Sequence, residues 1–137
     1  GNLIFGCDIC QDVCPWNTEV PHSTVQEFKP RDFNKYSDLR KLAQITPEEF
    51  RERYRGSAIK RTKWLGFIRN VVVAMGNSGD SKMIPELKHL LSNKYPMIRR
   101  HTIWALRKIG TPEALEAIRR HQEKSDGDKD LVLSEEI

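Results

Sequence analysis

Three cysteines near the start of the chain are the residues whose type and spacing most clearly suit a chemical role. Cys7, Cys10 and Cys14 follow the pattern C-x2-C-x3-C, and Pro15 comes directly after the last of them. This spacing matches the last three cysteines of the run C-x2-C-x2-C-x3-C-P, whose thiolates bind iron–sulfur clusters. An odd number of cysteines in so short a stretch argues against a secreted disulfide scaffold. Three buried structural thiols are the alternative interpretation.

The position of each cysteine in that run predicts which cluster it binds. The cysteines before the last hold one cluster, and the cysteine before proline reaches a second one. We therefore expect Cys7 and Cys10 to share one [4Fe-4S] cluster and Cys14 to bind another. The first cysteine of a complete run would fall on Ile4. Each cluster needs four thiolates, so either the missing ligands lie upstream of Gly1 or the clusters are absent.

The second half of the chain contains an internal repeat. A shift of 31 residues aligns Arg69 with Arg100, Gly79 with Gly110, and the apolar positions around them. Each unit has the pattern of a helix, a glycine-containing turn and a second helix, which is typical of a HEAT-like solenoid, although the period is short. Thr46 and Glu49 form a capping-box pattern that predicts a further helix over residues 47–55, ending at the glycine that follows.

These patterns predict a mostly α protein in four parts. Residues 1–20 would be the C-terminal part of a ferredoxin-like iron–sulfur domain, with Leu3, Ile4 and Phe5 shielding the cluster. Residues 21–46 would be a connector with a short helix near its end, and residues 47–124 a HEAT-like repeat domain. We expect the helix at 47–55 and the cysteine segment to cap the helical stack. The Ser- and Asp-rich residues 125–137 would be a disordered tail. The connector also carries three aromatic residues that we expect to pack on their neighbours, namely Phe28, Phe33 and Tyr36.

Charge is distributed very unevenly along the chain. Residues 51–124 hold 17 Lys/Arg and 6 Asp/Glu, a net charge of +11, whereas residues 1–50 have a net charge of −3. A basic block of this size favours a polyanionic partner, and basic residues on one helical face suit the phosphates of folded RNA. Arg69 and Arg100 occupy equivalent places in the two units, so a structural role is an equal alternative for them. The predicted RNA-binding residues are Lys60, Arg61, Lys63, Arg69, Arg99, Arg100 and Arg107.

Other kinds of site find little support in the sequence. No Ser/His/Asp or Cys/His nucleophile set stands out, and no glycine-rich phosphate loop follows a strand pattern. No apolar run approaches the roughly 20 residues of a membrane span, and no signal peptide is visible. Cluster thiolates would suit a reducing cytoplasm. No individual catalytic residue is predicted.

Three motifs together resemble one family. GCDICQDVCPWN at residues 6–17, GSAIKR at 56–61 and RNVVVAMGN at 69–77 are similar to the C-terminal part of the epoxyqueuosine reductases, which are cobalamin-dependent iron–sulfur enzymes. The resemblance covers nearly the whole chain and thins after about residue 122. It implies two [4Fe-4S] clusters in a longer protein, and a cobalamin bound mainly by an N-terminal part that this sequence lacks.

The resemblance also implies a function. Clusters would pass electrons to cobalamin, which reduces epoxyqueuosine to queuosine at the wobble position of tRNA, while the helical repeat holds the anticodon stem-loop. An external electron donor would be required, and we expect a monomer that is inactive as this fragment alone. The alternative is a non-catalytic HEAT-like binding module for RNA or protein, with a vestigial cysteine loop.

Overall fold

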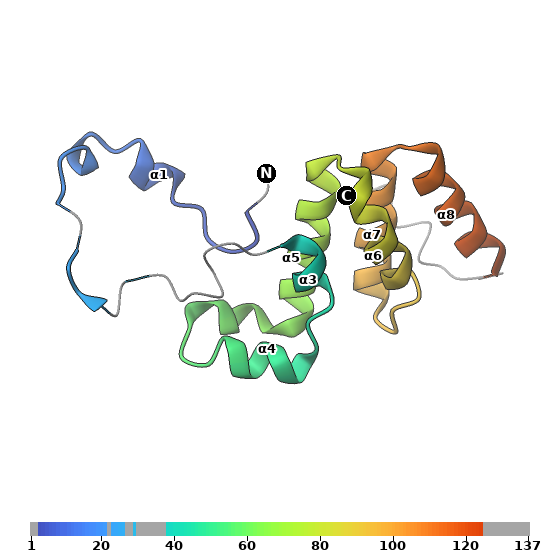
Figure 1. Cartoon of the computed structure of the whole chain (residues 1–137), viewed down its shortest axis with the longest axis horizontal. Helices are drawn as coiled ribbons and strands as arrows, with labels where there is room; N and C mark the ends of the chain where they lie inside the picture. Colours follow the sequence, from blue (N-terminus) through green and yellow to red (C-terminus); the bar gives the residue numbers. More distant parts are fainter. Residues whose placement is uncertain (1–2, 22, 27–28, 30–37, 125–137) are drawn as a thin grey trace.

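The computed structural model describes residues 3–21, 23–26, 29 and 38–124, and these residues form helices and loops with no β-strand among them. An extended N-terminal segment carries α1 (Ile9–Asp12) and η1 (Pro15–Asn17), and the remaining helices pack together beside it (Figure 1). The predicted mostly α fold class is therefore confirmed. The three connector aromatics and the tail at 125–137 lie outside the described residues, so the predictions for them stay predictions.

The internal repeat appears as two successive helical hairpins. The first contains α5 (Lys63–Ser78) and α6 (Ile84–Leu90), joined through η4 (Ser81–Met83), and the second contains α7 (Pro96–Ile109) and α8 (Pro112–Lys124). α5 and α7, the first helices of the two units, form the most extensive helix–helix contact. Each ends at a left-handed glycine, Gly79 with φ 64° and Gly110 with φ 70°. A side chain is rarely tolerated in this conformation, so the aligned glycines mark equivalent turns.

One glycine in α5 sets how closely the two units approach. A Cβ atom built on Gly76 would lie 2.8 Å from the Cα of Ala105 and 3.0 Å from the Trp104 ring. The first distance is shorter than real Cβ contacts and the second is at their lower limit, so α5 and α7 can cross here only because position 76 has no side chain.

The repeat encloses a continuous apolar core. Its interior also holds one polar side chain, Thr102, whose hydroxyl donates a 2.8 Å hydrogen bond to the carbonyl oxygen of Ile98. Burying a hydroxyl is tolerable when it is hydrogen-bonded in this way. Most of the fully buried apolar side chains come from α5, α6 and α7, and they include Ile68, Val71, Val72, Met75, Ile84, Leu87, Ile98, Ile103 and Leu106.

Short helices close the N-terminal end of the stack. They are α3 (Leu39–Ala43), α4 (Pro47–Arg53) and η3 (Ala58–Thr62). The predicted capping box is confirmed: the Glu49 N–H donates to the Thr46 hydroxyl at 3.2 Å, and the Thr46 N–H donates to the Glu49 carboxylate at 2.8 Å. The helix ends two residues earlier than predicted, at Arg53, and the chain then turns through Gly56 with φ 70°. The rings of Phe50, Tyr54 and Phe67 pack with centroids 5.1–5.2 Å apart.

The cysteine segment packs differently from the prediction. Between residues 5 and 20 every residue is exposed except Cys14, which is half-buried, so this stretch does not cap the helical stack. Ile4 packs against the helical core, whereas Leu3 and Phe5 remain 60% and 44% exposed. Ile4, one of the three side chains predicted to shield a cluster, therefore packs on the helical core instead.

Candidate iron–sulfur segment and basic helical face

The loop that carries the cysteines is organised by its own backbone hydrogen bonds. Gly6, with φ 72°, turns the chain just before Cys7. The N–H groups of Gln11 and Asp12 then donate to the Asp8 carbonyl at 2.8 and 2.9 Å, which forms the single turn of α1. The side chain of Asn17 donates to the Gln11 carbonyl at 3.0 Å and folds η1 back onto α1. These bonds hold the single helical turn of α1 between Cys7 and Cys14.

The three thiols are available as ligands. Cys7 and Cys10 are exposed, Cys14 is half-buried, and none of them is in a disulfide. The alternative of three buried structural thiols is therefore wrong. Accessible sulfur donors fit the soft-ligand chemistry of iron–sulfur clusters. Across the described residues, no three His, Cys, Asp or Glu side chains are grouped so that they could hold a metal ion, and the assignment of Cys7, Cys10 and Cys14 to two clusters remains a prediction.

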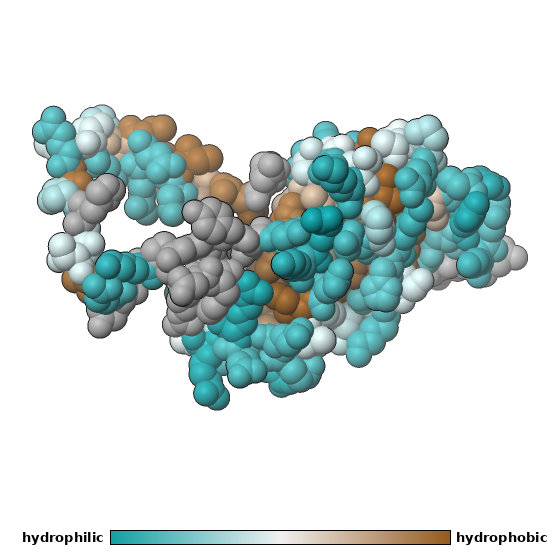
Figure 2. Space-filling model, in the orientation of Figure 1, coloured by the Kyte–Doolittle hydropathy of each residue, from teal (hydrophilic) through white to brown (hydrophobic). Residues whose placement is uncertain are grey.

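Large apolar side chains are exposed along this segment. Val13 and Trp16, on either side of Cys14, are 73% and 88% exposed, and Figure 2 shows apolar surface along the upper edge of the segment. Beyond this part of the chain, Leu115 is the one other large apolar side chain among the described residues that is similarly exposed. A concentration of exposed apolar side chains of this kind is typical of a surface that binds another protein part. The exposed apolar residues of the segment are Leu3, Phe5, Ile9, Val13, Trp16, Val20 and Val25.

One side chain of the repeat is hydrogen-bonded to the segment. The Asn70 amide on α5 donates a 2.7 Å hydrogen bond to the carbonyl oxygen of Ile4, three residues before Cys7. Its own oxygen accepts from the Arg69 guanidinium at 2.8 and 3.1 Å. Asn70 was not predicted as a site residue. Its partner is a backbone carbonyl 66 positions away, and no local pattern in the sequence signals such a bond.

The predicted RNA-binding residues fall into two groups. Lys60, Arg61 and Lys63, at the junction of η3 and α5, are exposed, as is Arg107 on α7. The others are half-buried: Arg69 is held by Asn70, Arg99 donates to the Asn93 carbonyl at 2.9 Å, and Arg100 lies beside it in the sequence. The contacts of Arg69 favour the structural alternative for that residue.

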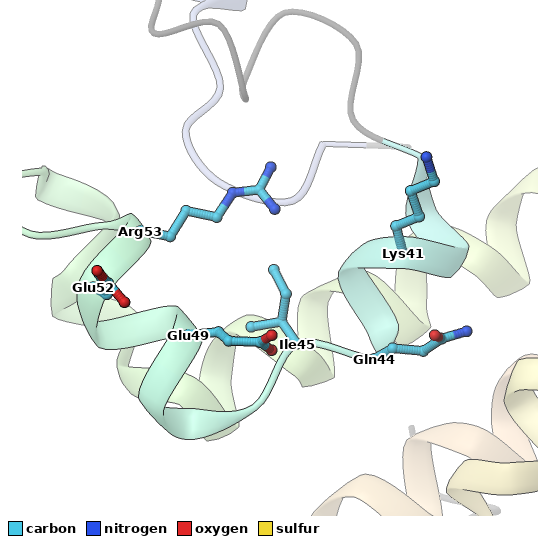
Figure 3. A pocket seen from close by; sticks show the side chains of 6 residues that line it. All are labelled: Lys41, Gln44, Ile45, Glu49, Glu52 and Arg53. Carbon is cyan, nitrogen blue, oxygen red and sulfur yellow. The ribbon is translucent and has the colours of Figure 1, made fainter.

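A cavity of about 580 Å³ lies between α3 and α4 and is not part of either predicted site (Figure 3). Lys41 and Arg53 stand on opposite sides of it, with Ile45 between them, and Glu49 and Glu52 lie on α4. The Glu49 carboxylate is already engaged in the capping box. Charges of both signs around one apolar residue do not define a ligand, and we assign no function to this cavity.

Sequence comparison identifies relatives with established names. Residues 67–132 match the HEAT repeats family. The chain is 37% identical over 113 residues to the epoxyqueuosine reductase of Pseudomonas aeruginosa, covering 80% of this chain and 31% of that protein. It is 35% identical over 106 residues to the epoxyqueuosine reductase of Escherichia coli, covering 77% of this chain and 28% of that protein. The chain thus spans about a third of the length of the curated relatives it matches.

Solved structures give the same result. A crystal structure of epoxyqueuosine reductase with an epoxyqueuosine-modified tRNA-Tyr stem loop matches with a TM-score of 0.85 and 28% identity, over 96% of this chain and 36% of that one. Epoxyqueuosine reductase from Bacillus subtilis matches with a TM-score of 0.86 and 29% identity, over 98% of this chain and 37% of that one. The resemblance first seen in three motifs is confirmed. None of the described helices is long and apolar enough to cross a membrane.

Proposed function

We propose that this chain, whose homologues are epoxyqueuosine reductases, is the C-terminal portion of an enzyme that reduces epoxyqueuosine to queuosine at the wobble position of tRNA. The observation that carries the proposal is the extent of the structural match. Reductase structures align with 96–98% of the chain, and so with the cysteine segment as well as the repeat. A solenoid adaptor would explain a match to the repeat alone.

In this proposal the cysteine segment is a ligand-bearing half of an iron–sulfur domain. Cys7 and Cys10 would hold one [4Fe-4S] cluster and Cys14 a second, and clusters of this type supply one-electron transfer. Burial tunes the potential of a cluster. The exposed side chains of Ile9, Val13 and Trp16 would exclude water from the thiolates once the rest of the domain packs on them.

The repeat would hold the RNA. One structural neighbour contains a tRNA stem loop, and the exposed cations Lys60, Arg61 and Lys63 form a cluster of positive charge at the entry to the repeat. Such contacts bind phosphates without reading bases, so we expect binding to weaken steeply with salt. Arg107 would extend the surface along α7, and the half-buried Arg99 and Arg100 would contribute through their remaining exposed atoms.

The remaining parts of the activity would lie outside this chain. The relatives are about three times as long, and we place the other cluster ligands and the cobalamin site in the portion not represented here. The 137-residue chain alone would then be inactive. In the whole enzyme we expect a monomer in the cytoplasm that accepts electrons from a separate electron donor.

Iron analysis under anaerobic conditions tests the proposal. We expect the longest native polypeptide to be coloured and to contain about eight irons, as two four-iron clusters require. Replacing Cys7 and Cys10 together with Ser should remove the iron of one cluster, and Cys14→Ser should affect the other. A colourless, iron-free native polypeptide would contradict the proposal and favour a HEAT-like adaptor with a vestigial cysteine loop, which the match at residues 67–132 alone would allow.

The RNA contact is tested separately. Replacing Lys60 and Arg61 with Ala should weaken binding of a tRNA stem-loop and lower the salt slope by about one for each lost phosphate contact. Replacing Lys82, an exposed lysine of η4, is the matched control. Unchanged affinity and slope in the double variant would remove Lys60 and Arg61 from the interface.

A further inference from the structure

A second cavity lies at the junction of α4 and α5, directly beside the exposed cations. Its volume is about 420 Å³, within the usual range for small-ligand sites. Pro47, Phe50 and Trp64 give it apolar walls, and Lys60 and Lys63 stand among its lining residues. Neither the cysteine chemistry nor the phosphate contacts proposed above require such a cavity.

The aromatic wall is held in place by the fold. The Trp64 indole N–H donates a 2.7 Å hydrogen bond to the carbonyl oxygen of Ile45. Its ring centroid lies 5.7 Å from that of Tyr95, at an interplanar angle of 60°. Phe50 is fixed from below by its ring contacts with Tyr54 and Phe67. A ligand that binds here would meet a preformed surface and would not have to order these side chains.

The positive side of the cavity has an unusual backbone. Lys63 has φ 55° and ψ 165°, and it is the one non-glycine residue with positive φ among the described residues. The neighbouring Thr62 hydroxyl donates to the carbonyl oxygen of Ile59 at 2.8 Å and also lies 3.1 Å from the carbonyl oxygen of Lys63. Strained residues of this kind are enriched at ligand-binding sites. Glu48 and Arg51 also line the cavity and form an exposed ion pair with each other at 2.7 Å, so Lys60 and Lys63 are the lining charges without an ion-pair partner in the cavity.

We propose that this cavity binds one unstacked nucleotide of an RNA loop, with the base against Trp64 and the flanking phosphates at Lys60 and Lys63. The inference rests on the proposed function and adds to it a site for a base. An aromatic wall with adjacent cations is the combination that binds single-stranded nucleotides, since every base has a face that can stack. The two lysine charges complement a phosphate, which favours a nucleotide over an apolar peptide as the occupant.

Tryptophan fluorescence tests the site directly. The chain has three tryptophans, so Trp16→Phe with Trp104→Phe leaves Trp64 as the only one. Titration with an RNA stem-loop should quench its emission, whereas a blunt duplex with the same number of phosphates should not. Adding Lys60→Ala and Lys63→Gln should weaken stem-loop binding and lower its salt slope by about two, one for each lost phosphate contact. Lys82→Gln should leave it unchanged, and circular dichroism should show that every variant is folded.

The outcomes separate this inference from the proposed function. If the stem-loop binds by gel shift but Trp64 is not quenched, or if the duplex quenches equally, the nucleotide site is wrong and the reductase proposal stands. If an aromatic acidic peptide quenches Trp64 and the stem-loop does not, the cavity belongs to a protein partner and the inference is overturned. If neither RNA binds the chain at all, the RNA-binding part of the proposed function fails together with the inference.

Discussion

The cysteine segment and the helical repeat differ in how far their apolar side chains are buried. In the repeat, side chains such as Leu87 and Ile103 have no exposed surface, and each helix is covered by its neighbours. In the segment, Val13 and Trp16 are 73% and 88% exposed, and Ile4 is the one described apolar residue that packs on the helical core. The comparison indicates that the repeat is stable through its own contacts, whereas the segment has the surface of a domain that is completed by another part.

The largest expected difference is between two truncations of apolar side chains. Leu87→Ala should lower the free energy of unfolding by about 2–5 kcal/mol, because it leaves a cavity in a core where Leu87 is fully buried. Val13→Ala should change it by less than about 0.5 kcal/mol, since Val13 is 73% exposed. Urea unfolding followed by circular dichroism measures both. A large effect of Val13→Ala would mean that the segment is already packed in solution and would remove the contrast.

Glycine-to-alanine substitutions at two positions of α5 test how closely α5 and α7 approach each other. Gly76→Ala should destabilise by about 1–3 kcal/mol, because its Cβ would lie 2.8 Å from the backbone of α7. Gly66→Ala should stabilise by about 0.5–1 kcal/mol, since its nearest neighbour, Thr62 Cβ, would lie at an ordinary 3.6 Å and alanine favours helix. Thermal unfolding of the two variants gives the comparison. Shifts of equal sign would show that α5 and α7 do not cross as closely as described.

The sequence was most informative where structure depends on neighbouring residues. The capping box at Thr46 and Glu49 and the paired glycines at 79 and 110 are patterns in the sequence itself, and both were predicted correctly. The packing of Ile4 on the repeat and its bond to Asn70 depend on contacts across 66 positions, which no periodicity encodes. The cavity at Trp64 likewise forms only where α4 and α5 pack together, and the sequence pattern does not show that contact. The assignment of Cys7, Cys10 and Cys14 as cluster ligands also depends on a local pattern, the ligand spacing, and it remains a prediction.

Loss of the hydrogen bond between the repeat and the cysteine segment should have a smaller effect on stability. Asn70→Asp keeps an acceptor for Arg69 but loses the amide that donates to the Ile4 carbonyl, so it should cost about 1 kcal/mol of local stability. Amide hydrogen exchange should become faster at residues 4–7 and stay unchanged in α6 and α7. Asn93→Ala, which loses only an acceptor for the Tyr95 N–H within the repeat, is the matched control. Unchanged exchange at residues 4–7 in Asn70→Asp would mean that this bond does not position the cysteine segment.

The smallest effect concerns the outer surface of the repeat. Hydrogen bonds from Arg119 and then Arg120 lower the pKa of Glu116 on α8 from 4.5 to about 2. Because the pKa is lower in the folded state, the carboxylate stabilises α8 at pH values above 4.5, and this contribution is lost as the pH falls toward 2. Glu116→Gln should therefore be less stable than the parent at pH 6, by a margin that closes between pH 4.5 and 2 and shrinks in high salt, because the group is exposed. Thermal unfolding across this pH range measures the margin. A margin that does not change with pH would show that Glu116 supports α8 through packing and not through its charge, and the surface of the repeat would then depend on contacts of the same kind as its core.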